Sequence, residues 1–558
     1  MFRSARMHRL PRRSPYEVAR MPTSTSDWSR RQVLEAAAGV AGAGALAVTA
    51  PVGAAADERH SGPTGLRPGE YFPRGAELTS ITAIDITGRS DPELTLLATA
   101  QGLAARTSAT PHLYLTSPGS VDQLWLDDLH ARGVKVRFAT DAWEIVAAQH
   151  IDRFVCYSAT DTSLSVATTA AGLLDAVVVE EALVPAAIAH GLRSVLDVRG
   201  KDDVWSFANL FPRTRHDFAV EQKDTFAYPL RDLGTMAGAF TYYDGNSALR
   251  ARINTALGKD SPVIGWGDAD NGEDKFVGPS SDAGNFLVAA DWARNTATLS
   301  SVSAPTLRQH DRKPLQARVG NHYVSFVVTD GDNLQWMTTS MPASTDWWAN
   351  PHRGEVALGW GMPPSMLDLA PSALRWYYDG AHEGPHGDQF TVGPSGSGYF
   401  YPSRYPRATL LEHTKRLDRA MRRTDVDVVQ ILDFDALATP ALWDAYTRRR
   451  SISGLIYLEY SRYDREAGKT IWSNGKPVTS ARHMLWDGLD GADEASVTAA
   501  LNAAPTDPRS VDSYSIVAVH AWSKKLDDVL TVVDGLADHV EVVCPGDLIK
   551  LMRATVER

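Results

Sequence analysis

Cysteine is scarce in this chain, and the common nucleotide-binding sequences are missing. Only Cys156 and Cys544 occur among 558 residues, and each ends an apolar, strand-like run, where a buried and inert thiol is the usual case. We therefore expect no disulfide between them and assign neither a catalytic role. No G-x-G-x-x-G follows a predicted strand and no Walker sequence occurs, so a nucleotide cofactor has no support and we predict no cofactor at all.

An excess of basic residues is also absent. Lys and Arg total 56 against 67 Asp and Glu, a net charge of -11, which argues against nucleic acid as the main partner. Apolar residues make up 44% and charged residues 22% of the chain, as in globular proteins and unlike disordered chains or polytopic membrane proteins. The length predicts several domains, and the acidic surface suits a neutral ligand better than an anionic one.

Residues 1–56 are predicted to be a twin-arginine signal peptide. The run from Ser29 to Leu34 reads S-R-R-Q-V-L, and an uncharged stretch rich in Ala and Gly extends from Ala36 to Ala56. This stretch is weakly apolar and is interrupted by Pro51, so we expect cleavage before Asp57 rather than a membrane anchor. The prediction makes the twin-arginine (Tat) export machinery a partner and the location extracytoplasmic, with no stable membrane insertion after cleavage; Met21 is an alternative start.

Residues 70–215 alternate short β-branched runs with longer amphipathic segments, a pattern typical of α/β subdomains. A helix is predicted from Asp91 to about Ala105, because Asp91-Pro92-Glu93 supplies a cap, a proline for the first turn and an acid beside the positive helix end. The predicted strands are Ile81–Ile86, His112–Leu115, Val134–Phe138, Phe154–Tyr157, Ala176–Val179 and Ser194–Val198.

Residues 216–300 have a different character and are predicted to form a third subdomain. An apolar strand at Pro262–Trp266 leads into a polar, glycine-rich loop, and we expect this loop and Trp266 to contribute one wall of a cleft. The loop starts like a calcium site, but Gly272 and Glu273 occupy positions where an EF-hand needs a ligand and a glycine. Residues 301–320 are predicted to be a linker.

Residues 321–558 contain eight strand candidates, most of them separated by helical segments. Eight such units in about 250 residues match a TIM-barrel-like (β/α)8 domain. The predicted strands are His322–Val328, Glu355–Trp360, Gln389–Val392, Val426–Leu432, Ser453–Leu458, Pro477–His483, Ser515–Val519 and Val540–Val543. The fold class is therefore α/β, with a barrel preceded by α/β subdomains.

Acids, aromatics and a histidine follow the predicted barrel strands almost at once. Because the carboxyl ends of parallel barrel strands share one rim, these residues are predicted to converge on one pocket. Glycoside hydrolysis needs one protonated and one ionised carboxyl group, together with aromatic surfaces against sugar faces. We predict that the acid and the base or nucleophile come from Asp330, Asp332, Asp433 and Glu459, that His520 orients substrate or shares a proton, and that the substrate contacts are Trp266, Trp360, Tyr399, Tyr401, Arg482 and Trp522.

Two other interpretations stay open at this point. A metal-dependent polysaccharide deacetylase could use Asp330, Asp332 and His520 as zinc ligands, although the H-x-x-x-H that such enzymes carry is missing. A non-catalytic glycan-binding protein could keep the same pocket. The run from His382 to His386 fits H-E-x-x-H, but Gly-Pro between the histidines breaks the helix that zinc binding would need, so no metal site is predicted.

One run is specific enough to indicate a family. Residues 396–402 read G-S-G-Y-F-Y-P, and the chain resembles the GxGYxYP putative glycoside hydrolases, named after that string. The resemblance extends to residues 326–336, 359–361, 472–477 and 519–522, and covers about 70–553. It implies a TIM-barrel-like C-terminal domain behind N-terminal α/β subdomains, in exported bacterial proteins that act on an oligo- or polysaccharide. It supplies no catalytic pair, so the choice of acids rests on their positions.

Overall fold

We analysed a computed structural model of the chain. It describes residue 67 and residues 70–558, except 244–247, 304 and 311–313. The predicted signal peptide lies outside these residues. Within the part of the chain that is described, each helix is too short or too polar to cross a bilayer.

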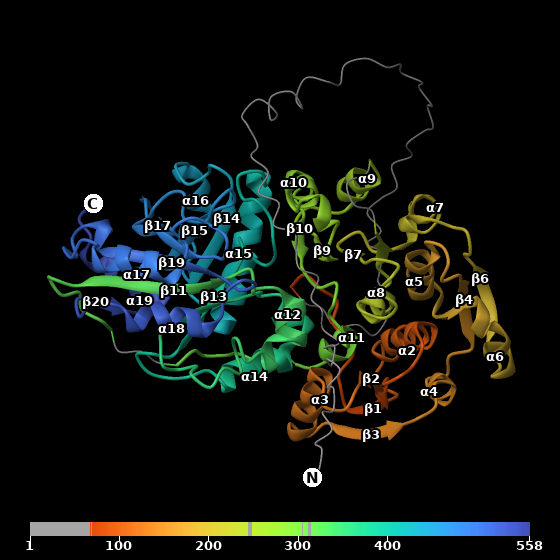
Figure 1. The fold of residues 1–558 in the computed structure, drawn as a ribbon. Coiled ribbons are helices and arrows are strands. Elements are labelled where there is room, and N and C mark those ends of the chain that lie inside the picture. The colour runs from red at the N-terminus through yellow and green to blue at the C-terminus, as the bar shows by residue number, and fades with distance from the viewer. Residues whose placement is uncertain (1–66, 68–69, 244–247, 304, 311–313) are drawn as a thin grey trace, which may run out of the picture. The chain divides into compact units, whose positions relative to one another are not determined.

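The first N-terminal subdomain is a small parallel sheet in the strand order β2-β1-β3, flanked by helices (Figure 1). Its first helix begins as expected near Asp91, although the N-cap is Ser90 rather than Asp91. The Ser90 backbone N–H donates a hydrogen bond to the Glu93 carboxylate. The elements are β1 (Ser80–Asp85), α2 (Asp91–Ala104), β2 (His112–Thr116), α3 (Val121–Ala131), β3 (Lys135–Ala139) and α4 (Ala142–Ala148).

The second and third subdomains repeat this layered construction. The second has the parallel order β5-β4-β6, and the third has β10-β9-β7-β8. Cys156, in β4, is buried as predicted. The elements are β4 (Arg153–Tyr157), α5 (Ser163–Leu174), β5 (Val177–Glu180), α6 (Val184–Ala189), β6 (Arg193–Asp197), α7 (Asp203–Asn209), β7 (Ala219–Glu221), α8 (Arg231–Ala237), β8 (Phe240–Tyr242), α9 (Ala248–Ala256), β9 (Pro262–Gly265), α10 (Asp274–Ala283), β10 (Phe286–Val288) and α11 (Thr296–Leu299).

The C-terminal region is built on one strongly curled, barrel-like sheet, which confirms the predicted fold class. Its strands run in the order β16-β17-β15-β14-β13-β12-β11-β19-β18, and β16 alone is antiparallel to its neighbour. β17 and β18 are consecutive in the chain, and the residues between them bond to both ends of the sheet: Ala481 N–H donates to Tyr457 and Arg482 N–H to Ile516. The sheet therefore curls until its two ends meet.

The elements of this region are β11 (His322–Thr329), α12 (Leu334–Thr339), β12 (Leu358–Met362), α13 (Met366–Leu369), α14 (Pro371–Asp379), β13 (Asp388–Val392), α15 (Arg407–Thr424), β14 (Val428–Asp433), α16 (Pro440–Thr447), β15 (Gly454–Glu459), β16 (Thr470–Ser473), β17 (Lys476–Ser480), β18 (His483–Leu485), α17 (Glu494–Asn502), β19 (Tyr514–His520), α18 (Leu526–Asp534), β20 (Val540–Val542) and α19 (Pro545–Thr555).

The strand arrangement differs from a regular eight-stranded barrel at β20. The sequence predicts that this segment closes the barrel between β19 and β11. Instead β19 pairs with β11 along Tyr323–Thr329, while β20 pairs only with residues 322–324 of β11. The seven-residue register between β19 and β11 occupies that edge of β11 completely, so β20 has to use the other edge, below the point where β12 joins.

The third subdomain and the barrel share a hydrophobic core. The loop that contains G-S-G-Y-F-Y-P lies against β10, where Leu287 and Tyr399 exchange two backbone hydrogen bonds of 3.0 and 2.7 Å. Burial of apolar surface from both sides holds this contact together. The shared cluster includes Phe240, Val263, Phe276 and Leu287 from the subdomain and Tyr323, Val327, Tyr401 and Ile456 from the barrel.

Candidate active site

The turn after β11 carries two acidic side chains to the carboxyl end of the curled sheet. Asp330 adopts a left-handed backbone conformation, with φ of 64°, and Asn333 caps α12 by accepting a hydrogen bond from Trp336 N–H. Gly331 has no side chain because a Cβ there would collide with the ring of Trp336. The T-D-G-D-N run thus forms a tight strand-to-helix turn that fixes Asp330 and Asp332.

Asp332 lies in a space that two glycines leave open. A Cβ on Gly361 or Gly393, at the ends of β12 and β13, would sit 2.7 Å or less from atoms of the Asp332 side chain. Asp332 is 8% exposed. Burial, followed by the charges of Asp330 and Glu273, raises the pKa of its carboxyl group to about 7.

Asp330 is held differently. The Tyr463 hydroxyl donates a 2.9 Å hydrogen bond to its Oδ1. Its Oδ2 is buried and has no hydrogen-bond partner in the described chain. One carboxylate oxygen is thus anchored and the other is available.

Glu273 is a third carboxylate of this cluster, and it comes from the third subdomain. Burial, then the charge of Asp330, raises the pKa of Glu273 to about 7. Its own charge raises the pKa values of Asp332, Tyr399, Tyr460 and Tyr463 in turn. Sequence reasoning did not select Glu273, since only the expected cleft-wall loop pointed toward it. We call Glu273, Asp330 and Asp332 the mouth carboxylates.

Aromatic side chains surround the mouth carboxylates. Tyr399 and Tyr401 lie side by side, with ring centroids 5.8 Å apart, and Trp266 stacks on Tyr399 at 5.8 Å with an interplanar angle of 12°. Tyr401 also meets Phe434 and Tyr460 edge-on. Neither Tyr399 nor Tyr401 has a hydroxyl hydrogen bond of normal geometry within the described chain. Among the described residues, the mouth therefore contains a buried carboxylate oxygen without a partner, Asp330 Oδ2, and tyrosine hydroxyls that interact only with one another.

His520 ends β19 beside β11, in register with Thr329. Its ring stacks on Trp486 with centroids 3.5 Å apart, and its Nδ1 lies 2.8 Å from the Ser523 hydroxyl oxygen. Burial lowers the pKa of His520, against an upward effect of the Asp330 and Asp487 charges. A neutral imidazole here can orient a hydroxyl group. Sequence analysis did not select Trp486. The predicted sixth strand, Pro477–His483, covers most of β17 and only the first residue of β18, and Trp486 directly follows the end of β18 at Leu485.

Asp433 and Glu459 do not join the mouth carboxylates. They are paired in register on β14 and β15. Asp433 accepts hydrogen bonds from Ser403 N–H, the Ser403 hydroxyl and Phe434 N–H. Burial nevertheless raises the pKa of Asp433 to about 6, and it raises the pKa of Glu459 as well.

Glu459 accepts hydrogen bonds from the Tyr457 and Ser461 hydroxyls and from Asp435 N–H. The alternation of side chains along a strand explains this placement. Gln430 reaches across the barrel interior to Val328 O, and Asp433, three residues further along β14, therefore lies on the opposite face of the strand. The hydrogen bonds of Asp433 and Glu459 are those of loop anchors, and a catalytic role for this pair stays a prediction.

Two of the predicted substrate contacts lie elsewhere. Trp360 is 1% exposed, donates from Nε1 to Asp388 at 2.8 Å and packs against Trp347 and Trp348, so it belongs to the core. Arg482 donates to backbone oxygens of Val511 and Tyr514, at the start of β19 and thus at the end of the barrel opposite the mouth. Trp522 is 48% exposed and contacts Trp336, so its ring is accessible.

The two glycines of the G-x-G-Y-x-Y-P run serve close packing rather than an unusual backbone conformation. The sequence predicts that they permit a tight turn, but neither is among the residues with positive φ. A Cβ on Gly396 would lie 2.3 Å from His413 Nε2, and one on Gly398 would lie 2.3 Å from Leu287 O. The motif is therefore a docking loop that presents Tyr399 and Tyr401 to the mouth.

His413 fixes the start of this loop. Its Nε2 accepts the Ser397 N–H at 3.1 Å, so Nδ1 carries the proton and donates it to Asp260 at 2.7 Å. Ser397, His413 and Asp260 are the residue types of a hydrolase triad, but Nε2 is already occupied by a backbone donor and cannot serve as a base for the serine hydroxyl. We assign the three residues a structural role.

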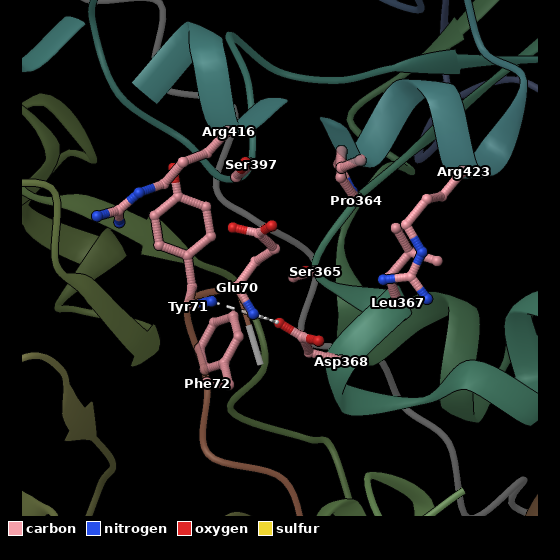
Figure 2. A pocket seen from close by; sticks show the side chains of 11 residues that line it. Glu70, Tyr71, Phe72, Pro364, Ser365, Leu367, Asp368, Ser397, Arg416 and Arg423 are labelled. Carbon is pink, nitrogen blue, oxygen red and sulfur yellow. Dashed lines mark hydrogen bonds between the residues drawn. The ribbon is translucent and has the colours of Figure 1, made fainter. Parts of the chain in front are cut away.

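A small crevice lies behind the loop, away from the mouth carboxylates. Figure 2 shows it between Tyr71, Ser397 and Asp368, and Asp368 accepts the backbone N–H groups of Glu70 and Tyr71. It encloses about 20 Å³, room for roughly one water molecule. The crevice is too small for a sugar.

The described residues offer no evident metal centre. Among them, no group of three or more His, Cys, Asp or Glu side chains is arranged to hold a metal ion. Asp330, Asp332 and His520, the set that a zinc-dependent deacetylase would need, do not form such a group.

The architecture and the mouth together define a barrel-like α/β protein that gathers carboxylates at the carboxyl end of its sheet. Four family models match the chain: the GxGYxYP_N first domain at residues 80–149, the second domain at 151–214, the third domain at 216–301 and the GxGYxYP putative glycoside hydrolase C-terminal domain at 320–553. The chain belongs to the GxGYxYP putative glycoside hydrolase family.

A solved structure is similar over nearly the whole length. It is that of a putative hydrolase from Bacteroides thetaiotaomicron, with 31% sequence identity and a TM-score of 0.81 over 88% of this chain and 99% of that one. A comparison with curated proteins finds no match.

Proposed function

We propose that this protein hydrolyses glycosidic bonds by carboxylate acid/base catalysis at the mouth of the curled sheet. The observation that carries the proposal is the cluster of the three mouth carboxylates. The pKa values of Glu273 and Asp332 are raised to about 7, and the third, Asp330, accepts a hydrogen bond from a tyrosine hydroxyl. Near neutral pH such a cluster keeps one carboxyl group protonated and another ionised, which is the requirement of glycoside hydrolysis.

The surroundings of the cluster support a carbohydrate substrate. Tyr399, Tyr460 and Trp266 offer aromatic faces and hydroxyl groups within one neighbourhood, a combination that suits the apolar faces and hydroxyl edges of a sugar. Family membership points to the same substrate class. We further propose that the protein acts after export, as residues 29–34 indicate.

Substitution of Asp330 tests the proposal. On a panel of oligo- and polysaccharides we expect turnover by the wild type and a loss of about 100-fold or more in kcat for Asp330→Asn, because the proposed base or nucleophile is removed. Asp435→Asn is the control, since Asp435 lies on the same rim but is exposed and ion-paired with Arg465.

Two outcomes would contradict this function. A wild type that binds glycans but turns over none of them is a binding protein. Loss of activity in EDTA, with acetate as the product, indicates a metal-dependent deacetylase instead.

A further inference from the structure

We propose that Glu273, a residue of the third N-terminal subdomain, is the proton donor of the reaction, so that the active site is completed by two domains. This assignment rests on the proposed glycoside hydrolysis. It concerns a residue outside the barrel that no strand end of the barrel would have indicated.

The position of Glu273 is fixed by the helix that follows it. Glu273 is the N-cap of α10, and its backbone oxygen accepts the N–H groups of Phe276 and Val277. Further along α10, the Ser281 hydroxyl accepts Tyr401 N–H at 3.0 Å and Asp282 pairs with Arg404. The C-terminal end of the helix is thus fastened to Tyr401 of the motif loop and to Arg404 just after it.

A second contact fixes the loop that precedes Glu273. Trp266 stacks on Tyr399 and meets Phe276 edge-on, with centroids 5.1 Å apart. Gly267 passes close to the Phe276 ring, where a Cβ would lie 2.6 Å away. Both ends of the segment are therefore packed, and the Glu273 carboxyl group is left without a hydrogen bond or ion pair to another described residue.

Glu273 is better placed than Asp332 to meet a substrate. Asp332 is 8% exposed and is enclosed by Gly361 and Gly393. Glu273 keeps part of its surface exposed, although its carboxyl group is surrounded closely enough for burial to raise its pKa. Asp330 comes from the barrel and Glu273 from the third subdomain, and the charge of Asp330 acts on Glu273, so we place the two on opposite sides of the bound sugar in this proposal. A glycosidase needs its two carboxyl groups to flank the scissile bond in this way.

Unpartnered polar atoms at the same place indicate a ligand. Asp330 Oδ2 is buried and lacks a partner within the described residues. Tyr399 and Tyr401 are 7% and 0% exposed, and their hydroxyls have no hydrogen bond of normal geometry there, although they interact with each other and with Tyr460. A buried polar group without a hydrogen bond is unfavourable, and a sugar hydroxyl or ring oxygen would satisfy these atoms.

The proposed step is an acid-assisted cleavage of the glycosidic bond. The bond between the anomeric carbon and the leaving-group oxygen breaks while the Glu273 proton moves to that oxygen, which leaves as an alcohol. Asp330 either bonds to the anomeric carbon or takes a proton from the attacking water, according to the stereochemical course. Water supplies the new hydroxyl group at the anomeric carbon and, in the end, the proton that restores Glu273.

Substitution of Glu273 by glutamine tests the assignment through the leaving group. On an unactivated glycan we expect Glu273→Gln to lose about 100-fold or more in kcat/KM. A 2,4-dinitrophenyl glycoside of the same sugar needs no protonation to leave, so its kcat/KM is expected to fall by less than about 10-fold. The basic limb of the pH profile on the unactivated glycan disappears. Asp274→Asn is the matched control, because Asp274 is the next residue and pairs with Lys275.

The outcomes separate this assignment from the proposed function. Suppose that the wild type hydrolyses glycans and that Asp330→Asn abolishes turnover. If Glu273→Gln then lowers kcat/KM equally for both substrates, or for neither, Glu273 is not the donor and the proposed function stands. If the wild type hydrolyses nothing, the function itself falls and the assignment with it. Should Glu273→Gln fail to fold, Glu273→Asp replaces it: retention of the basic limb supports the donor role, and its loss overturns it.

Discussion

At the scale of single residues, the buried carboxyl group of Asp332 links stability to pH. Burial and two carboxylate neighbours raise its pKa from 3.8 to about 7. The folded chain therefore favours the protonated form, and ionisation destabilises it. The stabilising effect of the proton is fully present below pH 3.8 and is lost as the pH rises through about 7.

Replacing Asp332 with asparagine removes this ionisation. We expect Asp332→Asn to have nearly the wild-type melting temperature at pH 4 and a higher one at pH 8, where the wild type must ionise a buried group. The difference is on the order of 1–4 kcal/mol at 1.36 kcal/mol per pKa unit. Thermal unfolding followed by circular dichroism at the two pH values measures it. Equal shifts at both pH values would show that Asp332 is not a titrating group with a raised pKa.

At the scale of elements, the contact between the motif loop and β10 depends on an absent side chain. Gly398 packs against Leu287 O and the Phe286 ring, at distances of 2.3 and 2.6 Å from a hypothetical Cβ. β10 in turn continues the sheet of the third subdomain through β9. The loop can approach β10 closely enough for the Leu287–Tyr399 bridge only because residue 398 is glycine.

Alanine at position 398 is expected to separate the two elements. We expect Gly398→Ala to destabilise the chain by about 1–3 kcal/mol through overpacking and to lower its thermal unfolding midpoint. Gly258→Ala is the control, since a Cβ there meets its nearest neighbour at 3.4 Å, so only the small gain from a less flexible unfolded chain remains. An unfolding midpoint for Gly398→Ala as high as that of the control would contradict the close packing.

At the scale of the whole molecule, the third subdomain packs against the barrel through a shared hydrophobic core. The shared core and the α10 contacts bind it to the motif loop, and Glu273 reaches the mouth from it. Removing the subdomain would expose the apolar side of that core, so we expect the barrel to depend on it for both stability and the candidate site.

Export of the whole molecule is a further prediction, which rests on the sequence of residues 1–56. Residues 1–56 hold eight arginines and three acids, and we expect Arg30→Lys with Arg31→Lys to retain the protein in the cytoplasm. Immunoblots of cytoplasmic and extracytoplasmic fractions measure this, with Arg12→Lys and Arg13→Lys as the control pair. Unchanged export of the twin-lysine variant would refute the twin-arginine route.

Local patterns allowed much of this structure to be predicted. Apolar strands, helix caps and turn residues are decided by neighbours in the chain, so the α/β class, the helix at Asp91 and the placement of Asp330 and Asp332 after the first barrel strand could be inferred from the sequence. The Tyr399 and Tyr401 pair could be inferred too, because alternate residues of an extended segment share a face.

Tertiary structure alone decided which of these residues meet. Whether the Asp433 and Glu459 side chains point into or out of the barrel depends on which face of each strand lies inside. The edge of β11 that β20 uses depends on how far β19 extends along β11. Glu273 comes close to Asp330 because a loop about 60 residues earlier in the chain docks on the barrel. Such contacts depend on the packing of whole elements, a long-range property that neither composition nor spacing encodes locally.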